Sequence, residues 1–482
     1  MEAGVGVVFE RGCAMDGVAT LARRQVWAQQ QFGAAQLGDS RRTRRLVRLA
    51  VQMAGNSSGS IPQQAGNAAD MKAAYRLFAA EDVTHAAILQ PHVEQTRAWA
   101  GALACVFLVQ DTAELNFTNH LHCVGLGPIA RGGVLRGLHQ QNVLAIDPAA
   151  QRPLGLMYQR HHRRRSRPPG HSNDRTATRN IPLDERESYW WVEAIRAIGP
   201  PPLDVRWVHV GDRGEDIFGV YDEARRQGAD WLIRAARDRR VQTPTGETLL
   251  MSYARNLPSL ATRRLNVRTP GGGTRPTELH VAAGRATLPP VRFEREYRDC
   301  DPIECWVVRS WESQPLAGNE PLEWILLTSL SCATPAEATF AAEGYSLRWM
   351  IEEFHKCEKT GCQVEARRLT DTVRLEPLIA LLSVLAVWLL TLKYAARDEP
   401  EKPANECFDE VMVTVMASYL KRPASTLTLS EFWRGIGRLG GHPGRKRDGP
   451  LGWLRAWRGW QSFQLILLGA ELYHERARSN CG

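Results

Sequence analysis

The spacing of apolar residues is helical in the first hundred residues of the chain. Basic and apolar residues alternate at helical spacing there, most clearly in the run LGDSRRTRRLVRLAVQMA. Asp39 and Ser40 begin the helical part of this run, where they can cap a helix. We therefore expect a small helical domain over residues 27–100. Residues 1–26 form an extension before it and are a candidate for disorder.

Strand-like spacing replaces the helical pattern beyond residue 100. The apolar run ALACVFLVQD predicts a first strand, and NVLAI with PLGLMYQR predicts a hairpin. A helix, a strand, a helix and a strand are then predicted, in this order, over ESYWWVEAIRAI, VRWVHVGD, EDIFGVYDEARRQ and DWLIRA. This order of elements indicates an α/β fold with a mixed sheet and flanking helices.

The second half of the chain begins with a β-rich pattern and ends with helices. Over residues 237–340, short apolar runs alternate with turn sequences, which predicts a β-rich insertion with Trp306 and Trp324 on strands. Helical spacing returns at Ala341. Residues 394–482 alternate helical segments with loops rich in Gly, Pro and Arg, so we expect a helical C-terminal domain there.

The longest apolar stretch of the chain covers residues 378–392. It is shorter than the roughly 20 residues that a helix needs to cross a bilayer, so we expect a buried helix and no membrane partner. The first residues lack the basic start and apolar run of a secretory signal. The ten cysteines include no CxxC pair, which favours reduced thiols in a cytoplasmic protein.

The charge of the chain gives the first indication of a partner. The 482 residues include 61 Lys and Arg against 52 Asp and Glu, a net charge of +9. A chain of this length is expected to fold as several domains. Its basic character and its many arginines favour nucleic acid, because a guanidinium group can bind phosphate through two hydrogen bonds.

A cluster of arginines strengthens this interpretation. Four of them occupy the first turns of the predicted N-terminal helix: Arg41, Arg42, Arg44 and Arg45. A helix that only had to fold would favour acidic residues at this end, because of its dipole. The cluster therefore indicates a negatively charged partner. A solvated basic helix face is the alternative.

Two aspartates follow predicted strands. Asp111 follows VFLVQ and Asp212 follows VRWVHVG, so both are expected near the carboxyl ends of strands, where side chains can converge on a ligand. Such an Asp can equally be a turn or helix cap. The pair becomes informative only together with a third acid.

The third acid lies in the segment EGYSLRWMIEEFHKCEKTG. If the segment is one helix, a polar stripe of roughly 60° forms, composed of Tyr345, Arg348, Glu352 and Lys359. Apolar side chains cover much of the remaining surface, so the stripe is expected to line a site. The alternative is a helix with ordinary ion pairs, such as Glu352 with Lys356, each worth about 0.2–0.5 kcal/mol.

Three convergent carboxylates beside Lys and Arg suit phosphodiester chemistry. Mg²⁺ prefers oxygen ligands, and Mn²⁺ is a possible substitute. Two such ions about 3.5–4 Å apart can activate the attacking oxygen and stabilise the leaving oxygen. The sequence has no HExxH or P-loop motif that would support another reaction. A DNA-binding regulator without catalysis, or a nuclease that cuts without joining, remain as alternatives.

At these residues the chain resembles the bacterial insertion-sequence DDE transposases that carry the Y-(2)-R-(3)-E-(6)-K motif, such as the transposon-five transposase. The four residues of the predicted stripe fit this spacing without a gap, and RWMIEEFHK is similar to the family's RWRIEEFHK. Segments along the whole chain are also similar: WAQQQFGAAQLGDSRRTRRLV, QDTAELNF, GDRGEDI, LEWILLTS and RLGGHPGRKRDG.

The resemblance implies a fold and an activity. The fold is an RNase H-like catalytic core over residues 101–393 with a β-rich insertion, flanked by helical end-binding and dimerisation domains. The activity is cut-and-paste transposition through a DNA hairpin, carried out by a homodimer on double-stranded DNA in the bacterial cytoplasm, at the nucleoid. Two parts depart from the family: the extension before Trp27 is longer, and the loop HHRRRSRPPGHSNDR is more basic.

The resemblance also implies roles for individual residues. The metal-binding triad is Asp111, Asp212 and Glu352. A second group is expected to contact DNA: Tyr345, Arg348, Lys356, Lys359, Trp324, Arg234, Arg41, Arg42 and Arg45. Within this group Trp324 takes the flipped base and Arg234 lies near the cleaved strand. The three N-terminal arginines recognise the transposon end.

Overall fold

The computed structural model describes residues 24–130, 134–164, 185–268, 274–291, 294–313, 321–445 and 451–479. Contacts divide the chain into two compact units. The helical unit consists of the chain up to Gln95, Lys356–Leu369 and the chain from Val373 on, and the sheet unit consists of Thr96–His355 and Thr370–Thr372. Most of the extension before Trp27 and much of the Arg-rich loop lie outside the described residues.

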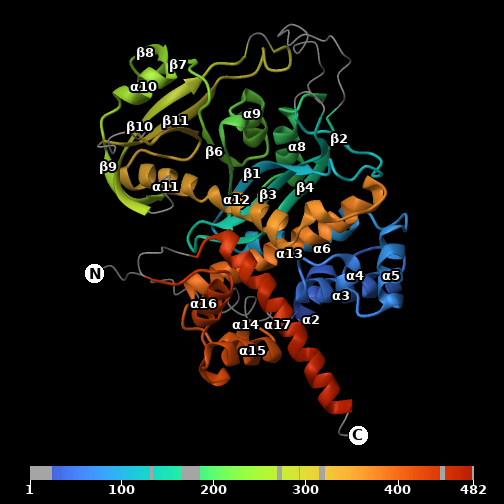
Figure 1. The fold of residues 1–482 in the computed structure, drawn as a ribbon. Helices are drawn as coiled ribbons and strands as arrows, with labels where there is room; N and C mark the ends of the chain where they lie inside the picture. Colours follow the sequence, from blue (N-terminus) through green and yellow to red (C-terminus); the bar gives the residue numbers. More distant parts are fainter. Residues whose placement is uncertain are drawn as a thin grey trace, which may run out of the picture. The chain divides into compact units, whose positions relative to one another are not determined.

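Helices from both ends of the chain build the helical unit, and Figure 1 draws them in blue and in orange to red. They are α2 (Arg24–Phe32), α3 (Ser40–Gly55), α4 (Ile61–Gln64), α5 (Ala68–Phe78), α6 (His85–Gly101), α13 (Thr372–Asp398), α14 (Ala404–Cys407), α15 (Glu410–Leu420), α16 (Leu429–Leu439) and α17 (Trp453–Ser479). Helices α6 and α13 each extend into the sheet unit at one end.

Helix α3 forms where the sequence predicts it. The Asp39 carboxylate accepts the backbone N–H of Arg41 at 2.8 Å and caps the helix, which confirms Asp39 as the N-cap. The apolar positions of the helix, among them Leu46 and Leu49, are buried. The rings of Trp27 on α2 and Trp388 on α13 stack with centroids 5.0 Å apart, so the two ends of the chain share one core.

Helix α13 is the apolar helix that the sequence predicts, but it is longer. It begins at Thr372, before Pro377, and its 27 residues are long and apolar enough to cross a membrane. Of its most apolar 18-residue window, however, 89% is buried inside the protein. The predicted buried helix is therefore confirmed, although the shortness of the apolar stretch was the wrong reason for it. Polar residues at both ends continue the helix beyond its apolar part.

Twelve strands of the described chain form one sheet in the sheet unit. They are β1 (Cys105–Asn116), β2 (Gly127–Pro128), β3 (Arg136–Asp147), β4 (Arg152–His162), β5 (Arg206–Gly211), β6 (Asp230–Arg234), β7 (Arg240–Thr243), β8 (Gly246–Leu249), β9 (Ala261–Arg268), β10 (Thr274–Leu288), β11 (Ile303–Glu312) and β12 (Glu323–Thr328). The helices of this unit are α8 (Tyr189–Ile198), α9 (Phe218–Arg226), α10 (Leu250–Asn256), α11 (Pro335–Ser346) and α12 (Trp349–Lys356).

The sheet is mixed, as predicted. Its strand order is β2-β3-β1-β5-β6-β12-β11-β10-β7-β8, with β4 beside β3 and β9 beside β10. Strand β5 runs parallel to β1 and β6, and the other pairs are antiparallel. The predicted order of strand, hairpin, helix, strand, helix and strand is confirmed by β1, β3, β4, α8, β5, α9 and β6. Only the short β2 has no counterpart in the prediction.

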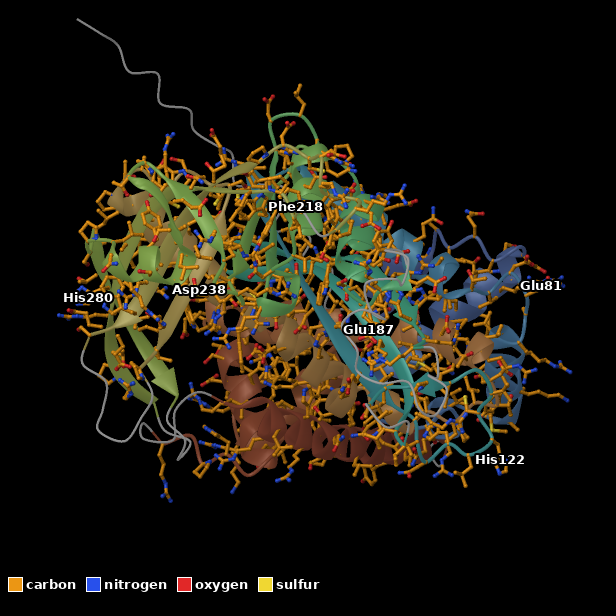
Figure 2. The ribbon with its side chains drawn as sticks, turned by 90° about the horizontal axis from the view of Figure 1, so that it is seen from above. Glu81, His122, Glu187, Phe218, Asp238 and His280 are labelled. Atoms are coloured by element: carbon orange, nitrogen blue, oxygen red, sulfur yellow. The ribbon has the colours of Figure 1, made fainter. Side chains whose placement is uncertain are left out.

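The β-rich region does not form a sheet of its own. Strand β12 pairs with β6, where Leu326 lies opposite Arg234, so strands β7 to β12 extend the core sheet. Figure 2 labels two residues of this region. Asp238 accepts the backbone N–H of Met251 in α10 at 2.9 Å, and the His280 ring of β10 stacks on a tryptophan of β11.

The two faces of the central strands carry different helices, which lie on opposite sides of the strands in Figure 1. Leu108 and Trp207 pack with buried residues of α8 on one face. On the other face, the Phe107 ring packs against Phe340 of α11 with centroids 5.7 Å apart. A Cβ at Gly344 of α11 would lie 2.4 Å from the Phe107 ring, so glycine is needed for this close approach.

Candidate active site

Asp111 lies inside a strand and not at its end. Strand β1 continues to Asn116, so the predicted position at a strand terminus is wrong. The parallel pairing of β1 with β5 nevertheless ends at Val109 and Val210, two residues before Asp111 and Asp212. Because aligned residues of parallel strands point to the same face, both aspartates are placed on the face that carries α11.

Asp212 follows β5 directly, as predicted, and begins a short 3₁₀ helix, Arg213–Glu215. Its Oδ1 accepts the backbone N–H of Gly214 at 2.6 Å. The capping role considered for this residue is therefore real, but it engages one carboxylate oxygen. A cap and a ligand role are compatible in the same side chain.

The segment with the third acid is not a single helix. Helix α11 ends at Ser346 and α12 begins at Trp349, which corrects the prediction of one continuous helix. Between them, the backbone N–H of Arg348 donates to the Tyr345 carbonyl at 3.1 Å, an i to i+3 bond that tightens the turn. The predicted stripe of side chains therefore follows two helices joined by a turn. The residues after α12 form a π-helical turn over Cys357–Gly361.

Arg348 links two of the acids. Its Nη2 lies 2.5 Å from Glu352 Oε1, and its Nη1 lies 3.7 Å from Asp111 Oδ2. Glu352 thus has an i,i+4 ion pair, but with Arg348 and not with the Lys356 considered in the alternative. The guanidinium is 17% exposed and contacts a carboxylate of another element. The pair therefore belongs to a tertiary cluster and not to a solvated helix surface.

The negative charges of the three acids repel one another. The pKa of Asp111 is raised to about 6, mainly by burial and also by the negative charges of Asp212 and Glu352, while the Arg348 charge opposes the rise. In the described part of the chain, no three His, Cys, Asp or Glu side chains already stand in the arrangement of a metal site. The donor set nevertheless fits a hard divalent cation, because carboxylate oxygens are its preferred ligands and excess negative charge favours it.

An aromatic and basic cluster lies next to the acids. The Trp324 and Tyr345 rings meet edge to face with centroids 5.5 Å apart. Burial lowers the pKa of Arg234, an effect that its hydrogen bond with Tyr345 opposes. Trp324 is only half-buried and is not a core tryptophan, which was the alternative for this residue. The structure therefore brings Trp324, Arg234 and Tyr345 together.

Two residues of this site have no signal in the sequence. Arg263 of β9 lies over the Trp324 ring at 5.5 Å and donates to the Ser346 hydroxyl at 3.4 Å. Glu215 is fully buried near Asp212. Arg263 belongs to no segment with a recognisable resemblance. Glu215 lies in the segment GDRGEDI, but nothing in that segment singles it out.

Comparison with known families gives two matches on this chain. Residues 24–83 match the model described as transposase DNA-binding, and residues 193–389 match the transposase DDE domain. The chain carries the two domains of a transposase. The DDE domain implies an RNase H-like α/β core, in agreement with the mixed sheet, and metal-dependent DNA cleavage. Asp212 and Glu352 lie inside the matched range and Asp111 lies before it.

The transposase DNA-binding domain contains the arginine-rich helix α3. Three of the predicted DNA contacts are paired within this domain: Arg41 with Asp39, Arg42 with Asp82 and Arg45 with Asp70, each at 2.7 Å. Part of the negative charge opposite this cluster is therefore the protein's own. Arg44 of the same helix is exposed.

The last two predicted DNA contacts of the transposase, Lys356 and Lys359, lie in the helical unit. The ammonium group of Lys359 is 3.5 Å from a Glu365 carboxylate oxygen. Both lysines therefore belong to a different unit from the acidic site.

Proposed function

We propose that the chain is a cut-and-paste DNA transposase of the insertion-sequence type with the YREK motif. One observation carries the proposal: Asp111, Asp212 and Glu352 converge from separate elements beside Arg348, in a chain with both transposase domains. The raised pKa of Asp111 supports a site built for a positively charged ligand, because like charges are held together there at low exposure.

The three carboxylates would hold two Mg²⁺ ions, with Mn²⁺ as a substitute. When bound, the metal activates the attacking oxygen and stabilises the leaving oxygen of an in-line displacement. Arg348 already neutralises part of the carboxylate charge. Its remaining hydrogen-bond donors are suited to a phosphate oxygen of the cleaved strand.

The aromatic and basic cluster would hold the DNA end. Trp324 offers a partly exposed indole to a flipped base, and stacking of this kind is worth about 1–3 kcal/mol. Tyr345 and Arg234 lie beside it and would contact the neighbouring phosphates. The predicted contacts of Lys356 and Lys359 with DNA rest on the YREK resemblance.

The proposed reaction is a series of phosphoryl transfers. Water nicks one strand, and the freed 3′-hydroxyl attacks the opposite strand to form a hairpin. A second water opens the hairpin, and the 3′-ends then join target DNA. A homodimer in the cytoplasm would bring two element ends together through the helical C-terminal part. The hairpin route and the dimer rest on the family resemblance.

The test is a cleavage and joining assay. Purified protein and Mg²⁺ are mixed with labelled DNA from the inverted repeats that flank the gene, and the products are separated by size. Hairpin and joined products are expected. Tight end binding without cleavage would instead identify a DNA-binding regulator, and cleavage without joining would identify a nuclease.

A further inference from the structure

A row of polar side chains crosses the core sheet at the level of Asp111. Asn142 of β3 lies directly opposite Asp111 of β1 in their antiparallel pairing. Gln159 of β4 lies opposite Asn142 in turn. Because residues that lie directly opposite each other point to the same face of a sheet, all three side chains are on the face that carries α11. The row therefore begins at an acid of the proposed metal site and leads away from it.

Asn142 is an unfavourable residue for its place in the fold. It is fully buried within β3, which has neighbouring strands on both sides, and Asn is depleted in strands. A buried amide destabilises a protein unless its hydrogen bonds are made. The Asn142 Oδ1 accepts the Gln159 amide at 2.8 Å, and its Nδ2 donates to the Gln140 carbonyl at 3.2 Å. The fold thus holds this side chain in one orientation.

In this orientation the amide also bonds to helix α12. The Asn142 Nδ2 lies 3.0 Å from the His355 Nε2. Because an amide nitrogen can only donate, the ring nitrogen is the acceptor of this bond. His355 lies three residues after Glu352 on the same helix, so both side chains project from neighbouring positions of its surface. The bond therefore ties the helix that carries Glu352 to the strand beside Asp111.

The link through Asn142 and His355 differs from the one that Arg348 makes. Arg348 joins Asp111 and Glu352 through their carboxylate oxygens, at 3.7 Å and 2.5 Å. A bound cation would compete with the guanidinium for the same oxygens, and its positive charge would repel it. The bond between Asn142 and His355 uses no carboxylate oxygen. It can therefore hold the two acids in place while their oxygens bind metal.

We propose that Asn142 and His355 are positioning residues of the divalent-metal site, and this inference rests on the proposed function. Their hydrogen bond sets the place of Glu352 relative to Asp111, so that both carboxylates meet one cation. Neither residue has to touch the metal. Groups that orient metal ligands in this way typically change metal affinity by about ten- to a hundredfold when they are replaced.

The test measures Mn²⁺ binding to the full chain by electron paramagnetic resonance, and the Tm without metal reports on folding. His355→Leu removes the acceptor of the bond and should weaken Mn²⁺ binding by roughly ten- to a hundredfold. His355→Gln can place an amide oxygen where the ring nitrogen accepts the bond. This conservative variant should therefore restore most of the affinity for Mn²⁺.

A double-mutant cycle tests whether the two residues act through each other. Asn142→Leu should weaken Mn²⁺ binding as much as His355→Leu does. The double variant should bind no more weakly than either, because the same bond is lost only once.

Gln141→Leu is the matched control for a buried amide on the same strand. Gln141 is as buried as Asn142, but successive side chains of a strand point to opposite faces, so it lies on the other face of the sheet. There its amide donates to the Gln110 Oε1 at 3.4 Å. The control should lower the Tm and leave Mn²⁺ binding unchanged.

The outcomes separate this inference from the proposed function. If Asp111→Asn weakens Mn²⁺ binding while Asn142→Leu and His355→Leu bind like the natural protein, the positioning role is overturned and the triad stands. Additive losses in the double variant, or an equal loss in Gln141→Leu, also overturn it. If the natural protein binds no Mn²⁺, the proposed function fails as well. Equal single losses without a further loss in the double variant support the inference.

Discussion

Arg348 explains how two of the three acids can stay together in a folded protein. Its guanidinium contacts Glu352 and Asp111 from one position, and both contacts are largely shielded from solvent. Burial lowers the pKa of Arg348, but the charges and hydrogen bonds around it prevail and raise it. The arginine thus stays charged. Its positive charge offsets the repulsion between the carboxylates, which would otherwise open the site.

Replacing Glu352 by Gln tests the catalytic role of the triad. The amide keeps the shape of the side chain but loses the charge that a metal needs, so cleavage should fall by roughly a thousandfold or more. Binding of end DNA, measured by gel shift, should stay nearly intact. Equal losses of binding and cleavage would show that α12 has only a structural role here.

Replacing Trp324 by Ala tests the base-stacking surface. Loss of an aromatic platform worth about 1–3 kcal/mol should lower the hairpin yield by roughly tenfold, while the first nick is spared. Trp306→Ala on the neighbouring strand β11 is the matched control and should leave the yield unchanged. A normal hairpin yield with Trp324→Ala would remove Trp324 from the DNA site.

The raised pKa of Asp111 predicts how pH affects the metal-free protein. In the unfolded chain this carboxyl has its ordinary pKa of 3.8, and in the folded protein the pKa is about 6. Its proton is bound more tightly in the fold, so its contribution to stability is present below about pH 4 and is lost as pH rises through 6.

The expected size of this loss is about 2–3 kcal/mol. Unfolding in urea with a chelator present, from pH 4 to 7, measures it as the difference between the natural protein and Asp111→Asn. As pH rises from 4 to 7, the unfolding free energy of the natural protein should fall relative to that of Asp111→Asn. A constant difference would contradict the shift.

At the scale of elements, the break between α11 and α12 does more than helical periodicity to position the residues of the motif. An unbroken helix would place Tyr345 and Glu352 on one face by rotation alone. In the structure the turn at Leu347 redirects the chain, and tertiary contacts with β1 and β12 bring the two residues to the same site. The spacing of the motif is therefore matched to a bend and not to a straight helix.

The arginines of α3 divide into structural and exposed members, which gives a matched pair of variants. Asp70 is 5% exposed and contacts both Arg45 and Arg48. Arg45→Ala removes one partner of this buried carboxylate and should cost about 1–3 kcal/mol of unfolding free energy. Arg44→Ala, at an exposed position, should leave the unfolding free energy within about 0.5 kcal/mol.

Arg44→Ala, which should leave stability unchanged, is instead expected to weaken DNA binding. If Arg44 contacts a phosphate, Arg44→Ala weakens end binding at every sequence and lowers the slope of log affinity against log salt by about one. Fluorescence anisotropy at several salt concentrations measures this slope. An unchanged slope would leave Arg44 as a solvated residue.

At the scale of the whole molecule, the helical unit depends on parts that are far apart in the chain. Arg24 forms an ion pair with Asp409 at 2.6 Å, and Trp27 stacks on Trp388. The buried guanidinium of Arg367 donates to the backbone carbonyl of Ser57 at 2.6 Å. The segment that matches the transposase DNA-binding model and the last third of the chain thus share hydrogen bonds and a core.

A chain that starts at residue 96 should therefore not keep this unit folded. Removing α2 to α5 and most of α6 would expose Trp388 and leave Arg367 without its acceptors at Ser57 and Gly59. We expect a low soluble yield and loss of the cooperative unfolding transition of the helical unit in calorimetry. Thermal unfolding identical to that of the full chain would show that the N-terminal part is independent.

The sequence alone determined most of the elements and pointed to the acids of the proposed site. The cap at Asp39, the strand before Asp212 and the order of strands and helices follow from residues that are close in sequence, and local spacing encodes them. The motif around Glu352 pointed to the third acid, and the two family matches agree with a transposase.

Only the tertiary structure decided which groups meet and how they are charged. The length of β1 beyond Asp111, the union of the β-rich region with the core through β12, and the pairing of Arg45 with Asp70 depend on partners distant in sequence. Glu215 is the clearest case, because its position one turn after Asp212 is visible in the sequence. Its burial without a hydrogen-bond partner among the described residues is not. Local patterns record the periodicity of one element, whereas burial and charge compensation arise from the packing of several.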